Sequence, residues 1–168
     1  MACALTQGFV LDCKESLGGV KSVRFVEFDN ATATYAAGVA TLTMATGKKF
    51  WKYAQVRETS SLTETITANV QNGTIFYQQE LTVILNKLAA ATRNEILLLA
   101  KNRLMAIVED MNGNFWLLGA KNGLDITSGN SATGTASGDR NGYSLTFQAM
   151  EADPMWSVLA STINAITN

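Results

Sequence analysis

The sequence predicts a mainly β protein, a sandwich or barrel of antiparallel strands with one flanking α-helix. Apolar and polar residues alternate over several short segments, which is typical of strands with one buried face. The dipeptide Asn-Gly begins at residues 72, 112, 122 and 141, and both residues tolerate the positive φ that a type I′ hairpin turn requires. The single proline, Pro154, follows all of these segments and therefore interrupts none of them.

The strongest hairpin prediction covers residues 105–118, where alternating segments flank Asn112 and Gly113. Thr, Val, Ile and aromatic residues, which suit a pleated surface, are common in the other candidate segments. These predicted strands are residues 20–28, 49–59, 62–70, 74–85 and 142–150.

One helix is predicted at about residues 92–102. Thr92 and Glu95 have the spacing of a capping box, in which each side chain accepts a hydrogen bond from a free backbone N–H. An apolar side and a basic C-terminal end follow, as expected for a helix lying on a sheet. A weaker helical segment is expected within residues 155–166.

The chain is long enough for one domain with a sizeable core, and we assign residues 1–168 to a single domain. Residues 1–17 form an N-terminal arm in this interpretation. Two stretches rich in small and polar residues, about 31–46 and 127–141, are predicted as long loops. The second is either a hairpin tip or an ordered subunit contact.

The composition favours a chain that is covered by neighbouring subunits. Apolar residues make up 47% of the sequence, which excludes a disordered chain. Charged residues make up only 16%, against roughly 25% in soluble domains. The alternative is an ordinary small β domain with a Thr-rich surface. The net charge is −1 with no basic patch, which argues against direct nucleic-acid binding but allows DNA to pass through a neutral or acidic channel.

The residues that most enzymes use are missing. The chain has no histidine, which removes the commonest general base and most metal sites, and it has no phosphate-binding loop. Glu109 and Asp110 are the closest carboxylate pair, but acidic residues before a turn are usually solvated, so a hydrolase is the least favoured interpretation. We expect no enzyme activity, cofactor or metal.

Cys3 and Cys13 are the only cysteines, and we expect reduced thiols rather than a disulfide in a reducing compartment. No apolar run approaches the roughly 18 residues of a membrane span, and the N-terminus lacks the features of a signal peptide. The sequence therefore predicts no membrane partner.

Much of the chain resembles a family of structural proteins from phages of Bacteroidetes bacteria, including crAss-like phages. The resemblance covers most of residues 10–158. It is carried by residues 95–119, which contain Asn-Gly-Asn-Phe-Trp-Leu-Leu-Gly, and by Asp-Arg-Asn-Gly-Tyr-Ser-Leu-Thr-Phe at residues 139–147. The start fits as well, with Leu-Gly-Gly-Val-Lys at residues 17–21. The order of elements is similar to that of phage tail tube proteins and the type VI secretion tube protein.

The resemblance implies a tail tube subunit that stacks in hexameric rings and forms a conduit for genome ejection. It implies assembly in the bacterial host cytoplasm, a place in the virion tail, and partners that include other copies, tail or neck proteins, DNA passing without specific binding, and a tail sheath in contractile tails. The residues expected to face the lumen are Glu64, Thr65, Thr67, Asn69, Gln78 and Glu80. The residues expected at subunit contacts are Trp51, Tyr53, Thr41 and Thr43.

Two alternatives remain open at this stage. One is a virion protein of the neck or head–tail junction. The other, of a different class, is a monomeric carbohydrate-binding β-sandwich that stacks sugars on aromatic side chains. The aromatic residues considered for such a platform are Trp51, Tyr53, Trp116 and Trp156.

Overall fold

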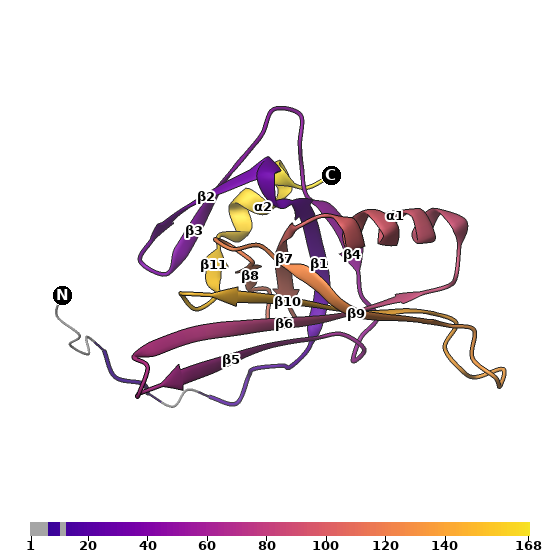
Figure 1. Cartoon of the computed structure of the whole chain (residues 1–168), viewed down its shortest axis with the longest axis horizontal. Coiled ribbons are helices and arrows are strands. Elements are labelled where there is room, and N and C mark those ends of the chain that lie inside the picture. The colour runs from indigo at the N-terminus through magenta and orange to yellow at the C-terminus, as the bar shows by residue number, and fades with distance from the viewer. Residues whose placement is uncertain (1–6, 11–12) are drawn as a thin grey trace.

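The computed structural model describes residues 7–10 and 13–168, and this part of the chain is mainly β (Figure 1). Strands hold 51% of the residues and helices 14%, in two sheets with a flanking helix, which confirms the predicted fold class. The strands are β1 (Val20–Glu27), β2 (Ala31–Ala36), β3 (Val39–Met44), β4 (Trp51–Ala54), β5 (Ser61–Asn69), β6 (Thr74–Asn86), β7 (Leu104–Asp110), β8 (Phe115–Leu118), β9 (Asp125–Ala132), β10 (Gly142–Glu151) and β11 (Trp156–Val158). The helices are α1 (Ala90–Lys101), α2 (Ala160–Ile166) and the short 3-10 helix η1 (Phe28–Asn30).

The strands form two sheets. The larger has the order β2-β3-β11-β8-β7-β1-β4, and the smaller has the order β5-β6-β10-β9. Neighbouring strands are antiparallel except for β11 and β3, which pair in parallel. In Figure 1 the strands of the smaller sheet run across those of the larger one.

The central strands of the seven-stranded sheet are buried on both faces and form the middle layer. Six of the seven residues of β7 are buried, so neither side of this strand reaches water. One face packs on the smaller sheet and α1, through residues that include Val23, Phe25, Val108, Leu81, Leu99 and Phe147. The other face of these central strands is covered by α2 and by the β2–β3 end of the same sheet, through residues that include Met105, Ile107, Ala40, Phe50 and Ile163.

The hairpin predicted at residues 105–118 is confirmed as β7 and β8, but its turn differs from the prediction. A type I′ turn needs positive φ at two residues, and here only Gly113 has it, at 85°. The loop has three residues, closed by the Asp110 N–H donating to the Asn114 carbonyl at 3.0 Å. The Asp110 carboxylate also accepts the backbone N–H of Asn112 at 2.8 Å, which holds the turn.

Both predicted loops are wrong in part. Residues 31–46 contain the β2–β3 hairpin, whose turn is Ala37-Gly38, with φ of 49° and 80°. This hairpin lacks the Asn-Gly pair and is held by the pairing of β3 with the distant β11. The stretch 127–141 begins inside β9, so only residues 133–141 lie outside a strand.

Element ends also depart from the predictions. Helix α1 begins at Ala90 after Ala89, without a side-chain cap, so the capping box predicted at Thr92 is wrong. Of the strand predicted at residues 49–59, only β4 is formed. The chain turns after β4, where the Gln55 and Ser60 side chains both accept the Ile84 N–H at 3.2 Å.

The two ends of the chain differ in how far their predictions hold. Residues 155–166 contain β11 before α2, so only the second half of the predicted segment is helical. Residues 7–10 and 13–17 of the arm contain no helix or strand, and Cys3 lies outside the described residues. No helix in the described part of the chain is both long and apolar enough to cross a membrane.

Candidate functional site

The outer face of the smaller sheet is a polar surface, which we call the polar face. Antiparallel partners point to the same side of a sheet, so the register defines this face. Thr65 pairs with Gln78, and Thr146 pairs with Thr82. The opposite side carries Leu81 and packs into the core. The polar residues of this face are Thr63, Thr65, Thr67, Asn69, Thr74, Gln78, Glu80, Thr82, Ser144, Thr146, Gln148, Ser128 and Asn130, together with Asp125. The same side also carries Phe76, Ile84, which is buried, and Met150, which is 53% exposed.

The polar face has no cationic residue. The chain has 13 lysines and arginines, and none of them lies in β5, β6, β9 or β10. Its two carboxylates belong to Glu80 and Asp125, both of which are exposed. A surface without cationic side chains offers no counter-charge to a phosphate backbone.

The structure brings five of the six predicted lumen residues onto the polar face. Thr65, Thr67, Asn69, Gln78 and Glu80 lie there, and their role in a lumen stays a prediction. Glu64 lies on the opposite side, paired with Gln79. Its carboxylate accepts the Gln79 amide at 3.1 Å and the Met155 N–H at 2.7 Å, so it ties the sheet to the segment before β11. Grouping Glu64 with the others was wrong, because side chains alternate between the faces of a strand.

The smaller sheet has two open edges. Strands β5 and β9 end the strand order, and within the described residues no further strand pairs with either of them. They are similar in length, with 9 residues in β5 and 8 in β9. An unpaired edge is a template for association with another chain.

The β5–β6 hairpin is apolar on its inner face near the turn, and we call this surface the apolar tip. Ile66, Ile75 and Val70 are 61%, 54% and 94% exposed there. Figure 1 shows this end of the hairpin extending past β1, β7 and β8, on the same side as the β2–β3 hairpin. Clustered exposed apolar side chains mark interaction surfaces.

The four residues predicted at subunit contacts lie in two places. Thr41 and Thr43 on β3 are exposed and pair with Thr34 and Thr32 of β2, which gives the hairpin a threonine-covered outer face. Trp51 and Tyr53 lie together on the end strand β4, away from that hairpin. Whether any of these residues contacts another copy stays a prediction.

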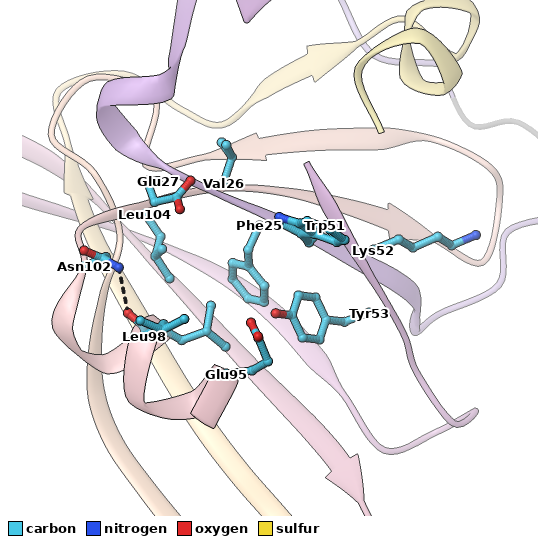
Figure 2. A pocket seen from close by; sticks show the side chains of 11 residues that line it. Phe25, Val26, Glu27, Trp51, Lys52, Tyr53, Glu95, Leu98, Asn102 and Leu104 are labelled. Carbon is cyan, nitrogen blue, oxygen red and sulfur yellow. Dashed lines mark hydrogen bonds between the residues drawn. The ribbon is translucent and has the colours of Figure 1, made fainter. Parts of the chain in front are cut away.

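Trp51 and Tyr53 help to line a groove between β4, β1 and α1, with a volume of about 530 Å³ (Figure 2). Trp51 is 60% exposed, whereas Tyr53 is half-buried, with its ring edge-on to Phe25 at 5.5 Å. Leu98 forms part of the helical wall and is 53% exposed. The groove is therefore apolar at its base and open to water.

Polar groups also face the groove. The Tyr53 hydroxyl and the Glu95 carboxyl point into the same space in Figure 2. Burial raises the pKa of Tyr53, and the nearby carboxylates of Glu95 and Glu27 raise it further. Asn102 donates its side-chain amide to the Leu98 carbonyl at 3.0 Å, which closes the C-terminal end of α1. The groove therefore carries polar groups above its apolar base.

The aromatic residues considered for sugar binding do not form one platform. Trp116 packs toward the core shared with the smaller sheet, with its ring N–H 3.3 Å from an Asp110 carboxylate oxygen. Trp156 packs on the other face of the sheet, beside Tyr35 at 4.7 Å between ring centroids.

The predicted carboxylate pair consists of two structural groups. Glu109 is buried, and its carboxylate lies 2.7 Å from the Lys21 ammonium and 3.2 Å from the Arg24 guanidinium. Asp110 caps the β7–β8 turn. Within the described residues, no three His, Cys, Asp or Glu side chains gather as metal ligands would.

Sequence reasoning missed Leu98 in the helical wall of the groove and Ile75 in the apolar tip. Leu98 lies next to the predicted apolar side of the helix, and leucines at three consecutive positions must leave at least one facing outward. Ile75 has a similar signal, since its spacing places it on the same side of β6 as Tyr77 and Leu81. Comparison with known proteins gives no further guidance, because no family model, curated protein or solved structure matches this chain.

Proposed function

We propose that this chain is a phage tail tube subunit, whose copies close into hexameric rings and stack into a conduit for genome ejection. The observation that carries the proposal is the polar face: a solvent-facing sheet surface without lysine or arginine, bounded by two open strand edges. In the ring, the polar face lines the channel and the larger sheet lies outside it. The resemblance to phage structural proteins supports the same assignment.

The strand directions suit ring closure. Each neighbouring pair in the order β5-β6-β10-β9 is antiparallel, so β5 and β9 run in opposite directions. In a cyclic ring every copy has the same orientation relative to the axis. The β9 edge of one copy therefore meets the β5 edge of the next in an antiparallel arrangement, and the alternation continues without a break. Closing the ring removes both exposed edges.

The charge pattern suits passage of DNA. Phosphates bind proteins mainly through lysine and arginine, and each such contact slows release. The polar face has none, and repeats of Glu80 and Asp125 around a ring would repel phosphates. DNA would then move along the channel without adsorbing to its wall.

The apolar tip and the low charge content suit a subunit that is covered on assembly. Ile66, Val70 and Ile75 face water in the single copy. A neighbour that covers them removes apolar surface from water, which stabilises the assembly by about 25 cal/mol per Å² of surface buried. The same tip would favour association of the free chain as its concentration rises.

A matched pair of variants tests the proposal. Ile66 and Thr67 are adjacent exposed residues of β5 that point to opposite faces. We expect Ile66→Lys to prevent ring and tube formation, because it puts a charge at the apolar tip. Thr67→Lys should leave assembly intact and line the channel with cations. Electron microscopy and sedimentation velocity at rising concentration measure assembly, and salt-dependent retention of double-stranded DNA measures the change in the channel.

The opposite results would overturn the assignment. A wild-type chain that stays monomeric at high concentration excludes a self-assembling tube, and rings that never stack point to the neck or head–tail junction. The exposed Trp51 favours one other function, carbohydrate binding. A monomer that retains glycans on an array and loses them on Trp51→Ala would support it.

A further inference from the structure

The N-terminal arm is tied to the β7–β8 turn through Ser16 and Leu17. Asn112, in the β7–β8 turn, accepts the Leu17 N–H at 2.8 Å and donates its side-chain amide to the Leu17 carbonyl at 2.8 Å. Its amide also lies 3.4 Å from the Ser16 hydroxyl. This two-way contact copies the hydrogen bonding of a neighbouring strand and fixes where the arm leaves the domain.

Beyond this anchor the arm carries large apolar side chains in water. Phe9 and Val10 are 92% and 85% exposed, the highest values for any large apolar side chain in the described residues apart from Val70. Figure 1 shows the arm running toward the end of the molecule opposite α1. The arm therefore runs away from β1, β4 and α1, the elements that line the groove.

The groove between α1 and β4 has what such an arm would need. Its base and walls include apolar surface from Phe25, Leu98 and Trp51, and its volume of about 530 Å³ lies in the range of sites that enclose a small ligand or a few side chains. Its outer wall is β4, which ends the strand order of the larger sheet. An extended segment laid along β4 could add backbone hydrogen bonds to apolar burial.

We propose that the arm of one copy docks in the groove of a second copy, with Phe9 against Leu98 and Trp51. The proposal rests on the proposed self-assembly. The length of the arm sets its range: Phe9 lies eight residues before Leu17, which spans about 26 Å when extended. That distance is about the width of a small domain, which suits a contact with an adjacent copy.

The occupant is a second copy because the arm runs away from the elements that line the groove of its own chain (Figure 1). A contact between unlike surfaces of identical chains is head-to-tail, and it repeats around a ring or along a stack. The segment from Gln7 to Val10 is uncharged, so it enters the groove without placing a charge on apolar Leu98.

Cross-linking of full-length chains tests the docking. In a background with both cysteines replaced by serine, copies carrying Phe9→Cys are mixed with copies carrying Leu98→Cys and mildly oxidised. We expect a disulfide-linked dimer of the two variants, identified by peptide mass. Leu97→Cys is the matched control, because Leu97 is a neighbouring exposed residue of α1 that does not line the groove. Its cross-linked yield should be several-fold lower.

Three results would overturn the docking. These are equal yields at positions 97 and 98, no cross-link at either, or an internal disulfide in a dilute variant carrying both Phe9→Cys and Leu98→Cys. The last result would place the arm in its own groove. Microscopy of the same samples separates the two proposals. Disulfide-linked dimers of the Phe9→Cys and Leu98→Cys variants without rings support arm docking and count against the tube, whereas rings without the cross-link support the tube and count against docking.

Discussion

The buried ion pair of Glu109 and Arg24 gives the clearest quantitative prediction. Both side chains are at most 8% exposed, on β7 and β1 in the middle sheet. Burial raises the pKa of Glu109, but hydrogen bonds from Lys21, Ser22 and Arg24 outweigh it and lower the pKa from 4.5 to about 2. That difference corresponds to about 3 kcal/mol of folding stability at pH 7, at about 1.36 kcal/mol per pKa unit.

We expect Glu109→Gln to lower the free energy of unfolding by about 3 kcal/mol at pH 7, because it leaves the Arg24 charge buried without its carboxylate. The sign of the pH dependence follows from the lowered pKa. The stabilisation is complete above the unfolded pKa of 4.5 and is lost as the pH falls toward 2. The gap between wild type and variant should therefore shrink by about 2 kcal/mol between pH 7 and pH 3.

Urea denaturation followed by tryptophan fluorescence, at concentrations where the chain is monomeric, measures both effects. Asp29→Asn is the control, because Asp29 also forms an ion pair, with Arg103 at 3.7 Å, but its side chain is 93% exposed. An exposed pair of this kind contributes less than about 1 kcal/mol. A Glu109→Gln variant as stable as wild type at pH 7, or a gap that stays constant with pH, would refute the reasoning.

Three further predictions concern packing and the arm. Phe147→Ala empties a fully buried site and should lower the unfolding free energy by about 3–5 kcal/mol in the same urea assay. Gly142→Ala would place a Cβ 2.2 Å from the Leu85 carbonyl oxygen, so β10 and β6 must move apart. We expect the unfolding free energy to fall by about 1–3 kcal/mol, with a lower Tm. Asn112→Ala should speed hydrogen exchange at the Leu17 amide while lowering global stability by only about 1 kcal/mol.

The sequence by itself predicted the elements whose cues are local. Residues 105–118 alternate on both sides of a turn dipeptide, and they form β7 and β8. The segments predicted at 20–28, 74–85 and 142–150 became β1, β6 and β10 with ends shifted by no more than about one residue. The sequence also indicated the polar character of the face around Thr65 and Thr67, because strand residues alternate between two sides.

The tertiary structure decided what depends on residues far apart in the chain. Residues 31–46 look like a loop because Ala and Thr give no clear apolar alternation there. They form strands because β3 pairs with the distant β11, and because Ala31 and Ala40 pack into the core. Helix α1 begins without the predicted cap. Packing of its apolar side on the core stabilises the helix, so a capped first turn is not required. The open edges of β5 and β9 and the groove beside β4 follow from the order of strands within the sheets. Alternation shows which side of a segment is apolar, but only long-range pairing determines which segment lies beside it and which is left uncovered.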